Sequence, residues 1–251
     1  MIGCNMEKVK LPDGVGIAIQ GPTNRVDEMV SFWSQFDCPK VWCTWSDEPA
    51  RNILKIERSG IEVILIDKPD YPGYLNCNMQ FKSSLFGLLR LKELGVKHAM
   101  KIRHDCIFYN LESIWPINEE ISFEHSYNPI YCTAIVYKIP KDLKNQLGEG
   151  VIHLGQDHPS DLCIFGKIDV LIKVFDLYME WNQPIPAESL ILKQWLDLKG
   201  LEDNFNPEFL KMNGLHYYGP DMIEKNSTLI WMKNNWDMRA ILINEPLIRI
   251  Y

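Results

Sequence analysis

Short apolar segments that each end in polar residues recur along the first half of the chain. They cover residues 15–19, 41–45, 62–66 and 98–102. Segments with the spacing of amphipathic helices lie between them. Short, nearly continuous apolar strands are typical of a parallel sheet that is covered on both faces. Strands alternating with helices predict right-handed βαβ units, and so an α/β fold with a mostly parallel central sheet flanked by helices.

The clearest helical segment runs over residues 79–94, and Gly95 is its stop signal. Phe81, Leu85, Leu88 and Leu89 recur at i, i+4, i+7 and i+8, so we expect them to share one face. The second half is less regular. It predicts a strand over 161–166 and helices over 168–181 and 187–198. Since no linker separates the halves, the pattern favours one domain over residues 1–251.

Composition excludes several classes of protein. The 251 residues carry 26 Lys and Arg against 33 Asp and Glu, a net charge of -7, which argues against nucleic acid as a partner. No apolar run approaches the ~18 residues of a spanning helix, and the first residues have no signal-peptide core, so we expect a cytoplasmic protein. The seven cysteines are an odd number without a C-x-x-C pair. That predicts free thiols and disfavours a zinc site.

The most informative charged stretch follows the strand at 98–102. In an open α/β sheet, ligands bind outside the carboxyl ends of the strands. Lys101, Arg103 and Asp105 alternate and would point the same way if the strand continues. Two cations suit a diphosphate, and a carboxylate suits a bridging divalent cation. The alternative is a solvated edge of charged residues.

A second polar group surrounds the start of the 79–94 helix. Asn76 or Asn78 would cap this helix in the simpler interpretation. Gln80 and Ser84 lie four residues apart and share a face, where they would meet a nucleotide or the strand that carries Arg103.

The loop after the first strand, Gln20-Gly21-Pro22, lets the backbone approach a ligand. It lacks both the G-x-G-x-x-G pattern and the P-loop lysine, so classical dinucleotide binding and P-loop chemistry are disfavoured.

Candidate general bases lie in the second half. Asp161 enters the strand predicted there, and Glu188 opens the helix that follows Pro186. The structural alternatives are a turn or cap role for Asp161 and a favourable first-turn carboxylate for Glu188. His216 is a candidate metal ligand, although a lone histidine is more often structural.

Several blocks together resemble the WavE lipopolysaccharide synthesis family. They are residues 16–22, 43–45, 73–80 with 83–84 and 87–88, 101–105 and 160–166, and the resemblance covers about residues 14–200. It implies a GT-A-like glycosyltransferase of bacterial surface polysaccharides, with a nucleotide-sugar half near 14–110 and an acceptor half near 111–251. The implied donor site consists of Gln20, Gly21, Pro22, Thr44, Trp45, Asp67, Asn76, Gln80, Ser84, Lys101 and Arg103.

By this resemblance, Arg103-His104-Asp105 occupies the place of the Asp-x-Asp metal motif of GT-A enzymes, with Arg in place of the first Asp. Two versions of the site follow. In one, Asp105 holds Mg²⁺ or Mn²⁺ with help from His216. In the other, Arg103 and Lys101 neutralise the leaving diphosphate and no metal is needed. Asp161 or Glu188 would take the acceptor proton if the reaction inverts.

The implied function is sugar transfer from a nucleotide-sugar donor to a lipid-linked or lipid A-core saccharide, in lipopolysaccharide or capsule synthesis. The implied place is the inner face of the bacterial inner membrane. Contact with lipid would be peripheral, because the net charge of -7 disfavours broad attraction to anionic headgroups. The alternatives are a sugar-phosphate nucleotidyltransferase and a non-catalytic saccharide-binding or assembly protein.

Overall fold

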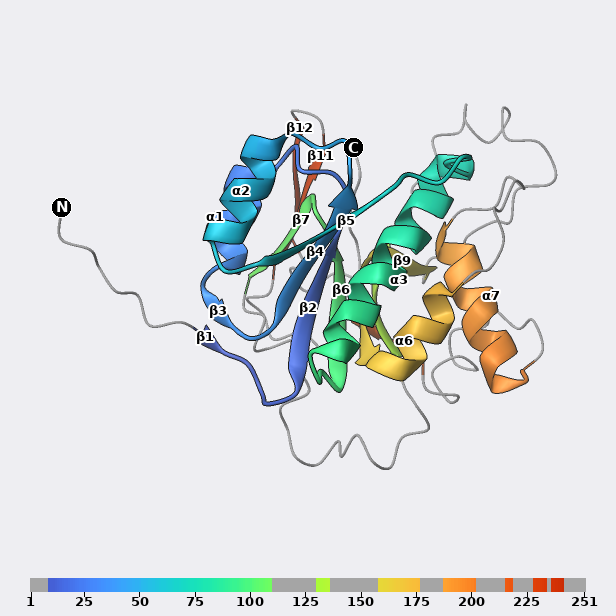
Figure 1. The fold of residues 1–251 in the computed structure, drawn as a ribbon. Helices are drawn as coiled ribbons and strands as arrows, with labels where there is room; N and C mark the ends of the chain where they lie inside the picture. The colour runs from blue at the N-terminus through green and yellow to red at the C-terminus, as the bar shows by residue number, and fades with distance from the viewer. Residues whose placement is uncertain are drawn as a thin grey trace.

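A computed structural model describes residues 9–109, 130–135, 158–176, 187–201, 215–218, 228–233 and 236–241. Its centre is a seven-stranded sheet in the order β10-β8-β9-β6-β2-β4-β5 (Figure 1). The strands are β2 (Val15–Gln20), β4 (Lys40–Trp45), β5 (Glu62–Ile66), β6 (His98–Arg103), β8 (Ile130–Ile135), β9 (His158–Lys167) and β10 (Leu215–Tyr218).

The predicted mostly parallel sheet is confirmed. β2 pairs in parallel with both β4 and β6, and β4 pairs in parallel with β5. β9 runs antiparallel to its neighbours β6 and β8, while β10 is again parallel to β8. All six residues of β2 and all six of β4 are buried, as expected of strands covered on both faces.

Helices cover both faces of this sheet, as Figure 1 shows. α1 (Val26–Trp33) and α2 (Ala50–Arg58) lie on one face. There, Trp33 and Ile56 pack in one cluster with Ile17 and Met100 of the sheet. α3 (Cys77–Glu93), α6 (Ile168–Phe175) and α7 (Ala187–Lys199) lie on the other face. Their apolar residues form a second cluster with Ala18 and Ala99 of the sheet.

The predicted helix over 79–94 is confirmed as α3, but its buried face differs from the expected one. Phe81 and Leu88 are buried, whereas Leu89 is 38% exposed. The residues on the sheet side include Ser84 and Gly87. A Cβ at Gly87 would lie 3.4 Å from Cβ of Ala18, so small residues let this helix lie close to the sheet.

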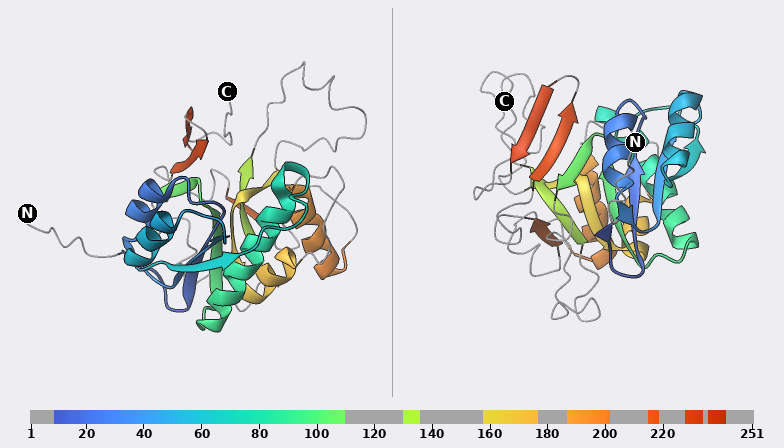
Figure 2. Two further views of the ribbon diagram at one scale, coloured as in Figure 1. Left: turned by 45° about the horizontal axis from the view of Figure 1, so that its top comes forward. Right: turned by 90° about the vertical axis from the view of Figure 1, so that its left-hand side faces the viewer.

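The remaining strands form smaller sheets. β1 (Val9–Lys10) pairs with β3 (Phe36–Asp37), and β11 pairs with both β12 and β7. The latter three are β7 (Cys106–Tyr109), β11 (Thr228–Lys233) and β12 (Trp236–Ile241). Figure 2 shows β11 and β12 side by side at the margin of the molecule.

Where the structure describes the second half, its predicted strand and second helix are confirmed and its first helix is shorter than predicted. The strand expected over 161–166 is part of β9, and the helix expected over 187–198 is α7. The helix expected over 168–181 begins as α6 at Ile168 and ends at Phe175, and 177–186 lie outside the described residues.

Two further sequence expectations concern cysteines and membrane helices. Cys38, Cys43, Cys77, Cys106 and Cys163 are free thiols, as predicted. Burial raises the pKa of Cys163 to about 12, so this thiol stays protonated. Within the described ranges, no helix combines the length and apolarity that a bilayer crossing requires.

Candidate functional site

The order of the central strands creates a point where the chain changes direction across the sheet. From β2 the chain moves to β4 and then β5 on one side, and it returns through α3 to β6 on the other side of β2. The loops after β2 and β6 therefore leave the same edge in different directions. In open α/β sheets this topological switch point is where ligands bind.

A cavity of about 300 Å³ lies at this switch point. Its walls come from the loops after β2, β4, β5 and β6 and from the start of α3, which follows the short 3-10 helix η1 (Tyr74–Asn76). The lining residues are Gln20, Gly21, Pro22, Trp45, Glu48, Lys68, Asn76, Met79, Gln80, Arg103 and His104.

Buried hydrogen bonds fix the loop after β2. Nε1 of Trp42 donates to the Gly21 carbonyl over 3.0 Å. The Gly21 amide donates to Cys43 O over 3.3 Å, and the His104 amide donates to Gln20 O over 2.9 Å. The loop is thus tied to both β4 and the end of β6, which makes it a preorganised wall for a ligand.

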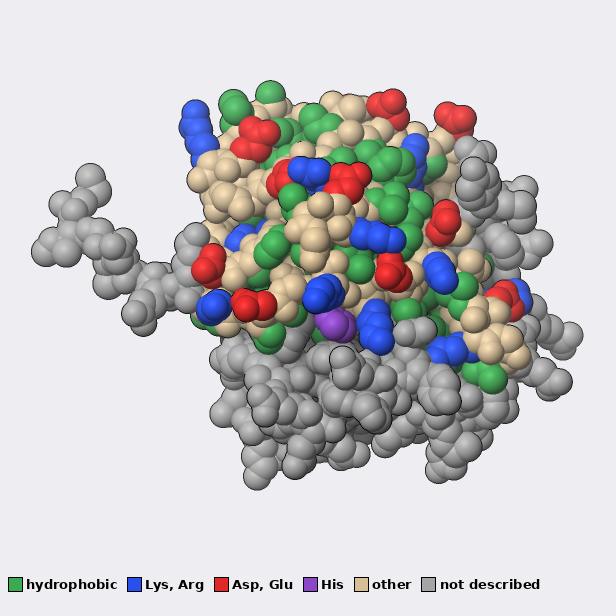
Figure 3. All heavy atoms as spheres, turned by 60° about the horizontal axis from the view of Figure 1, so that its bottom comes forward, with side chains coloured by type: hydrophobic (Ala, Val, Ile, Leu, Met, Phe, Trp, Pro, Cys, Tyr) green, Lys and Arg blue, Asp and Glu red, His purple; other side chains and the backbone are tan. Residues whose placement is uncertain are grey.

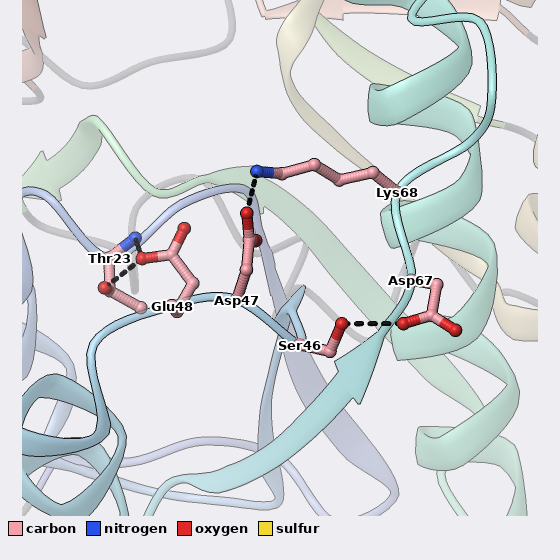
Figure 4. A network of polar contacts seen from close by, with 6 residues as sticks. All are labelled: Thr23, Ser46, Asp47, Glu48, Asp67 and Lys68. Carbon is pink, nitrogen blue, oxygen red and sulfur yellow. Dashed lines mark hydrogen bonds and ion pairs between the residues drawn. The ribbon is translucent and has the colours of Figure 1, made fainter.

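The next residues of the loop are tied to the segment after β4 (Figure 4). The Thr23 amide donates to Oε2 of Glu48 over 3.0 Å, and the Thr23 hydroxyl donates to the same oxygen. Nδ2 of Asn52 donates to the hydroxyl oxygen of Thr23 over 2.9 Å. Glu48 is thereby held in place as the carboxylate of the cavity wall.

The absence of a side chain at Gly21 leaves space for the imidazole of His104. A Cβ at Gly21 would lie 2.3 Å from Nδ1 of His104, and the backbone φ of Gly21 is +115°. Both the space and the backbone conformation therefore require glycine.

Gly21→Ala is expected to lower the free energy of unfolding by about 3 kcal/mol, because a positive φ and a steric clash act together. Gly60 is the matched control, since its φ is +81° and nothing lies within 4 Å of an added Cβ. Gly60→Ala should cost only about 1 kcal/mol for its backbone conformation. Urea denaturation of both variants measures the difference, and equal losses would contradict the role given to the contact with His104.

His104 is a neutral imidazole at the cavity. Burial lowers its pKa to about 4, and the nearby Asp105 only partly offsets this. Between pH 6.5 and about 4, the His104 side chain is protonated in the unfolded chain but stays neutral in the folded protein. Above pH 6.5 the ring is neutral in both states, so its contribution is constant there.

The contribution of His104 to the stability of the protein should therefore fall as the pH drops from about 6.5 to about 4, and stay constant below that. The part due to His104 is at most about 3 kcal/mol. Urea denaturation at a series of pH values, on the parent and on His104→Gln, isolates this part. An unchanged pH dependence in the variant would show that His104 titrates normally.

Arg103 and Asp105 form a bidentate ion pair at the end of β6. Nε of Arg103 donates to Oδ1 of Asp105 over 2.9 Å, and Nη2 donates to Oδ2 over 2.8 Å. The Asp105 residue is only 7% exposed, while the Arg103 side chain is 21% exposed and lines the cavity. The carboxylate fixes the plane of the guanidinium and so orients a cation at the cavity wall.

This pair bears on the predicted metal site. Both oxygens of Asp105 already accept from Arg103, and no cluster of three His, Cys, Asp or Glu side chains occurs in the described part of the chain. His216 lies in β10, and the position of its side chain falls outside the description. As arranged, Asp105 fits a positioning role for Arg103, and its role as a metal ligand stays a prediction.

Lys101 lies elsewhere in the fold. Its side chain is completely buried, and Nζ lies 5.6 Å from the centre of the Phe175 ring of α6. Because side chains alternate along β6, Lys101 and Arg103 are on the same face of the sheet. At Lys101, however, α6 covers this face. The cavity lining does not include Lys101.

Seven of the predicted donor-site residues line the cavity, and four do not. The seven are Gln20, Gly21, Pro22, Trp45, Asn76, Gln80 and Arg103. Besides Lys101, the four include Thr44 and Ser84, which are buried in the core, and Asp67, which accepts a hydrogen bond of 2.6 Å from Ser46. Asn76 holds the N-cap position of α3 with φ 64° but makes no side-chain capping bond. Nδ2 of Asn78 instead donates to Tyr71 O over 3.1 Å.

Four lining residues were missed by sequence reasoning: Glu48, Lys68, Met79 and His104. Lys68 brings a second cation to the cavity, and its ammonium pairs with Asp47 and lowers the pKa of that carboxyl (Figure 4). Glu48, Lys68 and His104 all stand one to three residues past a strand end. Because ligands bind at the carboxyl ends of strands, these three residues could have been predicted by considering every polar residue just after a strand.

The predicted bases have described backbones only. Asp161 lies in the first half of β9, which runs antiparallel to β6 with Cys163 opposite Ile102. Because the strands are antiparallel, Asp161 belongs to the sheet edge that carries Arg103. Glu188 lies in the first turn of α7.

No protein-family model and no curated protein matches this chain, so the resemblance to the WavE family stays a prediction. Among solved structures, the chain is similar to a protein assigned as a glucose-1-phosphate thymidylyltransferase from Bacillus anthracis, in complex with sucrose. The identity is 12%, with 88% of this chain and 91% of that chain covered, at a TM-score of 0.49.

Two further solved structures are similar. One is core-mannan synthase A from Aspergillus fumigatus in its Mn/GDP form, with 9% identity, 96% and 79% of the two chains covered and a TM-score of 0.44. The other is 4-diphosphocytidyl-2C-methyl-D-erythritol synthase from Anaerococcus prevotii, with 10% identity, 84% and 86% covered and a TM-score of 0.40. At these TM-scores the similarities assign no function, so a function can be proposed only from the residues of the cavity.

Proposed function

We propose that this chain is a nucleotide-sugar-dependent glycosyltransferase. The observation that carries the proposal is the cavity at the switch point, where Asp105 holds the guanidinium of Arg103 against the wall and Lys68 adds a second cation. Diphosphates are bound by such fixed guanidinium and ammonium groups. The other walls offer both apolar contacts and hydrogen-bonding groups, as a nucleoside requires.

The polar groups of the wall have a defined orientation. The Ser83 hydroxyl donates to Oε1 of Gln20 over 3.0 Å in a buried hydrogen bond, which leaves the NH₂ group of Gln20 as the end that meets a ligand. Glu48 is fixed by Thr23 and accepts hydrogen bonds from ligand hydroxyl groups. Trp45 and Met79 supply the apolar contacts.

In the proposed reaction, the bond between the anomeric carbon and the diphosphate oxygen breaks, and a bond from that carbon to the acceptor hydroxyl oxygen forms. The nucleoside diphosphate leaves with the bonding pair, and Arg103 and Lys68 stabilise the negative charge that develops on it. If the reaction inverts, Asp161 or Glu188 takes the proton of the hydroxyl. If it retains, neither needs to do so. If the enzyme uses a divalent cation, Asp105 and His216 are its candidate ligands.

The decisive experiment is a screen of nucleotide sugars with and without saccharide acceptors. A glycosyltransferase releases a nucleoside diphosphate or monophosphate from the donor, slowly by hydrolysis and faster with an acceptor. A sugar-phosphate nucleotidyltransferase instead releases pyrophosphate from a nucleoside triphosphate and a sugar phosphate. A saccharide-binding or assembly protein binds without turnover. Addition of EDTA separates the metal-dependent version from the version that relies on Arg103.

The wider role follows the predicted resemblance. We propose a lipid-linked or lipid A-core saccharide as acceptor, in bacterial lipopolysaccharide or capsule synthesis, and a position at the cytoplasmic face of the inner membrane. The acceptor half proposed for about 111–251 would supply its site. Recovery of the native protein from the periplasm would contradict this placement.

A further inference from the structure

A second cavity, of about 560 Å³, lies at the opposite edge of the sheet, and its charge is unlike that of the whole chain. Its charged and titratable lining residues are Lys92, Lys97, His98, Lys167, Asp169 and Lys173. Four lysines against one aspartate make it strongly basic, although the chain carries a net charge of -7. Figure 3 shows Lys and Arg side chains gathered around a His side chain on this face.

The one carboxylate of this cavity is already neutralised. Oδ1 of Asp169 lies 2.7 Å from Nζ of Lys92. Within the described residues, no ion pair involves Lys97, Lys167 or Lys173, and all three lysines line the cavity. Burial lowers the pKa of His98, and the charges of Lys167 and Lys97 lower it further.

The start of α6 adds hydrogen-bond donors to these charges. The helix begins at Ile168, and its N-cap residue Lys167 makes no side-chain capping bond. The Ile168 amide donates to Lys97 O over 2.9 Å, which ties the helix to the start of β6. The next amides, of Asp169 and Val170, belong to the first turn, where an α-helix supplies no acceptors, and both residues line the cavity. A helix N-terminus among lysines is a place where phosphate groups bind.

We propose that this cavity, at the amino end of β6 and the N-terminus of α6, is a binding site for a phosphate group. It is separate from the proposed donor site, because the six residues of β6 lie between them, a span of about 20 Å. The phosphate comes either from a soluble phosphorylated ligand or from the headgroup of an anionic lipid. The two sources present the same chemistry to the lysines.

Lys97 and Lys173 are the residues to change, since both are exposed and their removal leaves the core intact. The test variant is Lys97→Glu with Lys173→Glu. Its matched control is Arg51→Glu with Arg58→Glu on α2, two exposed residues, which changes the net charge equally on the other face of the sheet. Lys97→Gln with Lys173→Gln is the milder version if the reversal disturbs folding, as judged by circular dichroism.

Two probes distinguish the sources of the phosphate. Inorganic pyrophosphate is titrated calorimetrically into Arg103→Ala, in which the donor site is weakened, with and without the lysine changes. Vesicles of phosphatidylcholine containing phosphatidylglycerol are tested by cosedimentation against vesicles of phosphatidylcholine alone. We expect at least about a tenfold loss of affinity for one probe in the lysine variant, no such loss in the control, and weaker binding as salt is added.

Binding of pyrophosphate alone identifies a soluble ligand, and binding of the anionic vesicles alone identifies a headgroup. Absence of binding to both probes, or an equal loss in the lysine variant and the α2 control, overturns the site. Neither result depends on the donor screen, so the failure of one proposal does not decide the other.

Discussion

Arg103→Ala is expected to reduce turnover of the nucleotide-sugar donor by about 10²–10³-fold, the usual effect of removing one fixed electrostatic contact to the charge that develops in a transition state. Arg103 is the cation of the cavity whose plane is set by a two-pronged bond to a buried carboxylate. That orientation is fixed before the ligand arrives, so little reorganisation accompanies the reaction.

Arg103→Ala also alters the stability of the protein, and this effect must be separated from the effect on turnover. Removal of Arg103 leaves Asp105, which is 7% exposed, without its counter-ion. Breaking a buried pair from one side costs up to about 3–5 kcal/mol, and partial exposure of Arg103 reduces that figure here. Arg103→Ala with Asp105→Asn removes the stranded charge. This double variant should regain stability but not turnover.

Asp105 is tested in the same series. Asp105→Ala leaves the guanidinium without its orienting partner, and we expect it to remove most of the activity in a folded protein. Arg103→Lys keeps the charge but loses the paired geometry, and so it should fall between the parent and Arg103→Ala. Near-normal turnover in the folded Arg103→Ala or Asp105→Ala variants would refute the assignment of the donor diphosphate to this pair.

The strand pattern could be predicted from sequence because it is local. Each apolar run that ends in polar residues predicts one strand covered on both faces. In a parallel sheet, the loops after these strands then lie at the same edge. The place of β9 could not be derived in this way. It enters antiparallel between β6 and β8, a long-range pairing that no short segment encodes.

Lys101 shows how alternation alone misleads. The sequence indicates that Lys101 and Arg103 share a side of β6, and in the structure Met100 and Ile102 pack in the cluster on the opposite face. Whether a residue on that side meets a ligand or the core depends on α6, which begins more than sixty residues later and brings Phe175 over Lys101. Leu89 on α3 is a similar case, since the small residues Ser84 and Gly87 decide which face of the helix meets the sheet.

The catalytic base is the second large effect we expect, provided that the reaction inverts. A base must reach the acceptor hydroxyl on the side of the sugar opposite the leaving diphosphate. Residues of the first half line the donor cavity, so the base should come from the second half. The candidates are Asp161 in β9 and Glu188 at the start of α7.

The sheet register favours Asp161. Cys163 stands opposite Ile102, and β9 runs antiparallel to β6. Two residues before Cys163, Asp161 therefore lies beside the end of β6, at the edge where Arg103 meets the cavity. Glu188 has a structural role available to it, since a carboxylate in the first turn of a helix contributes about 0.3–1 kcal/mol to its stability.

Asp161→Asn is therefore expected to lower turnover by about 10²–10⁴-fold with donor affinity retained, because an amide keeps the shape of the side chain but does not accept the proton. Glu188→Gln is the matched comparison, and it should change turnover only a few-fold if its role is structural. Donor affinity, measured by calorimetry alongside turnover, separates loss of the base from loss of binding. A large effect in Glu188→Gln alone would exchange the two roles. If both variants turn over within a few-fold of the parent, the base lies elsewhere or the reaction retains configuration, and the stereochemistry of the product then decides between those two outcomes.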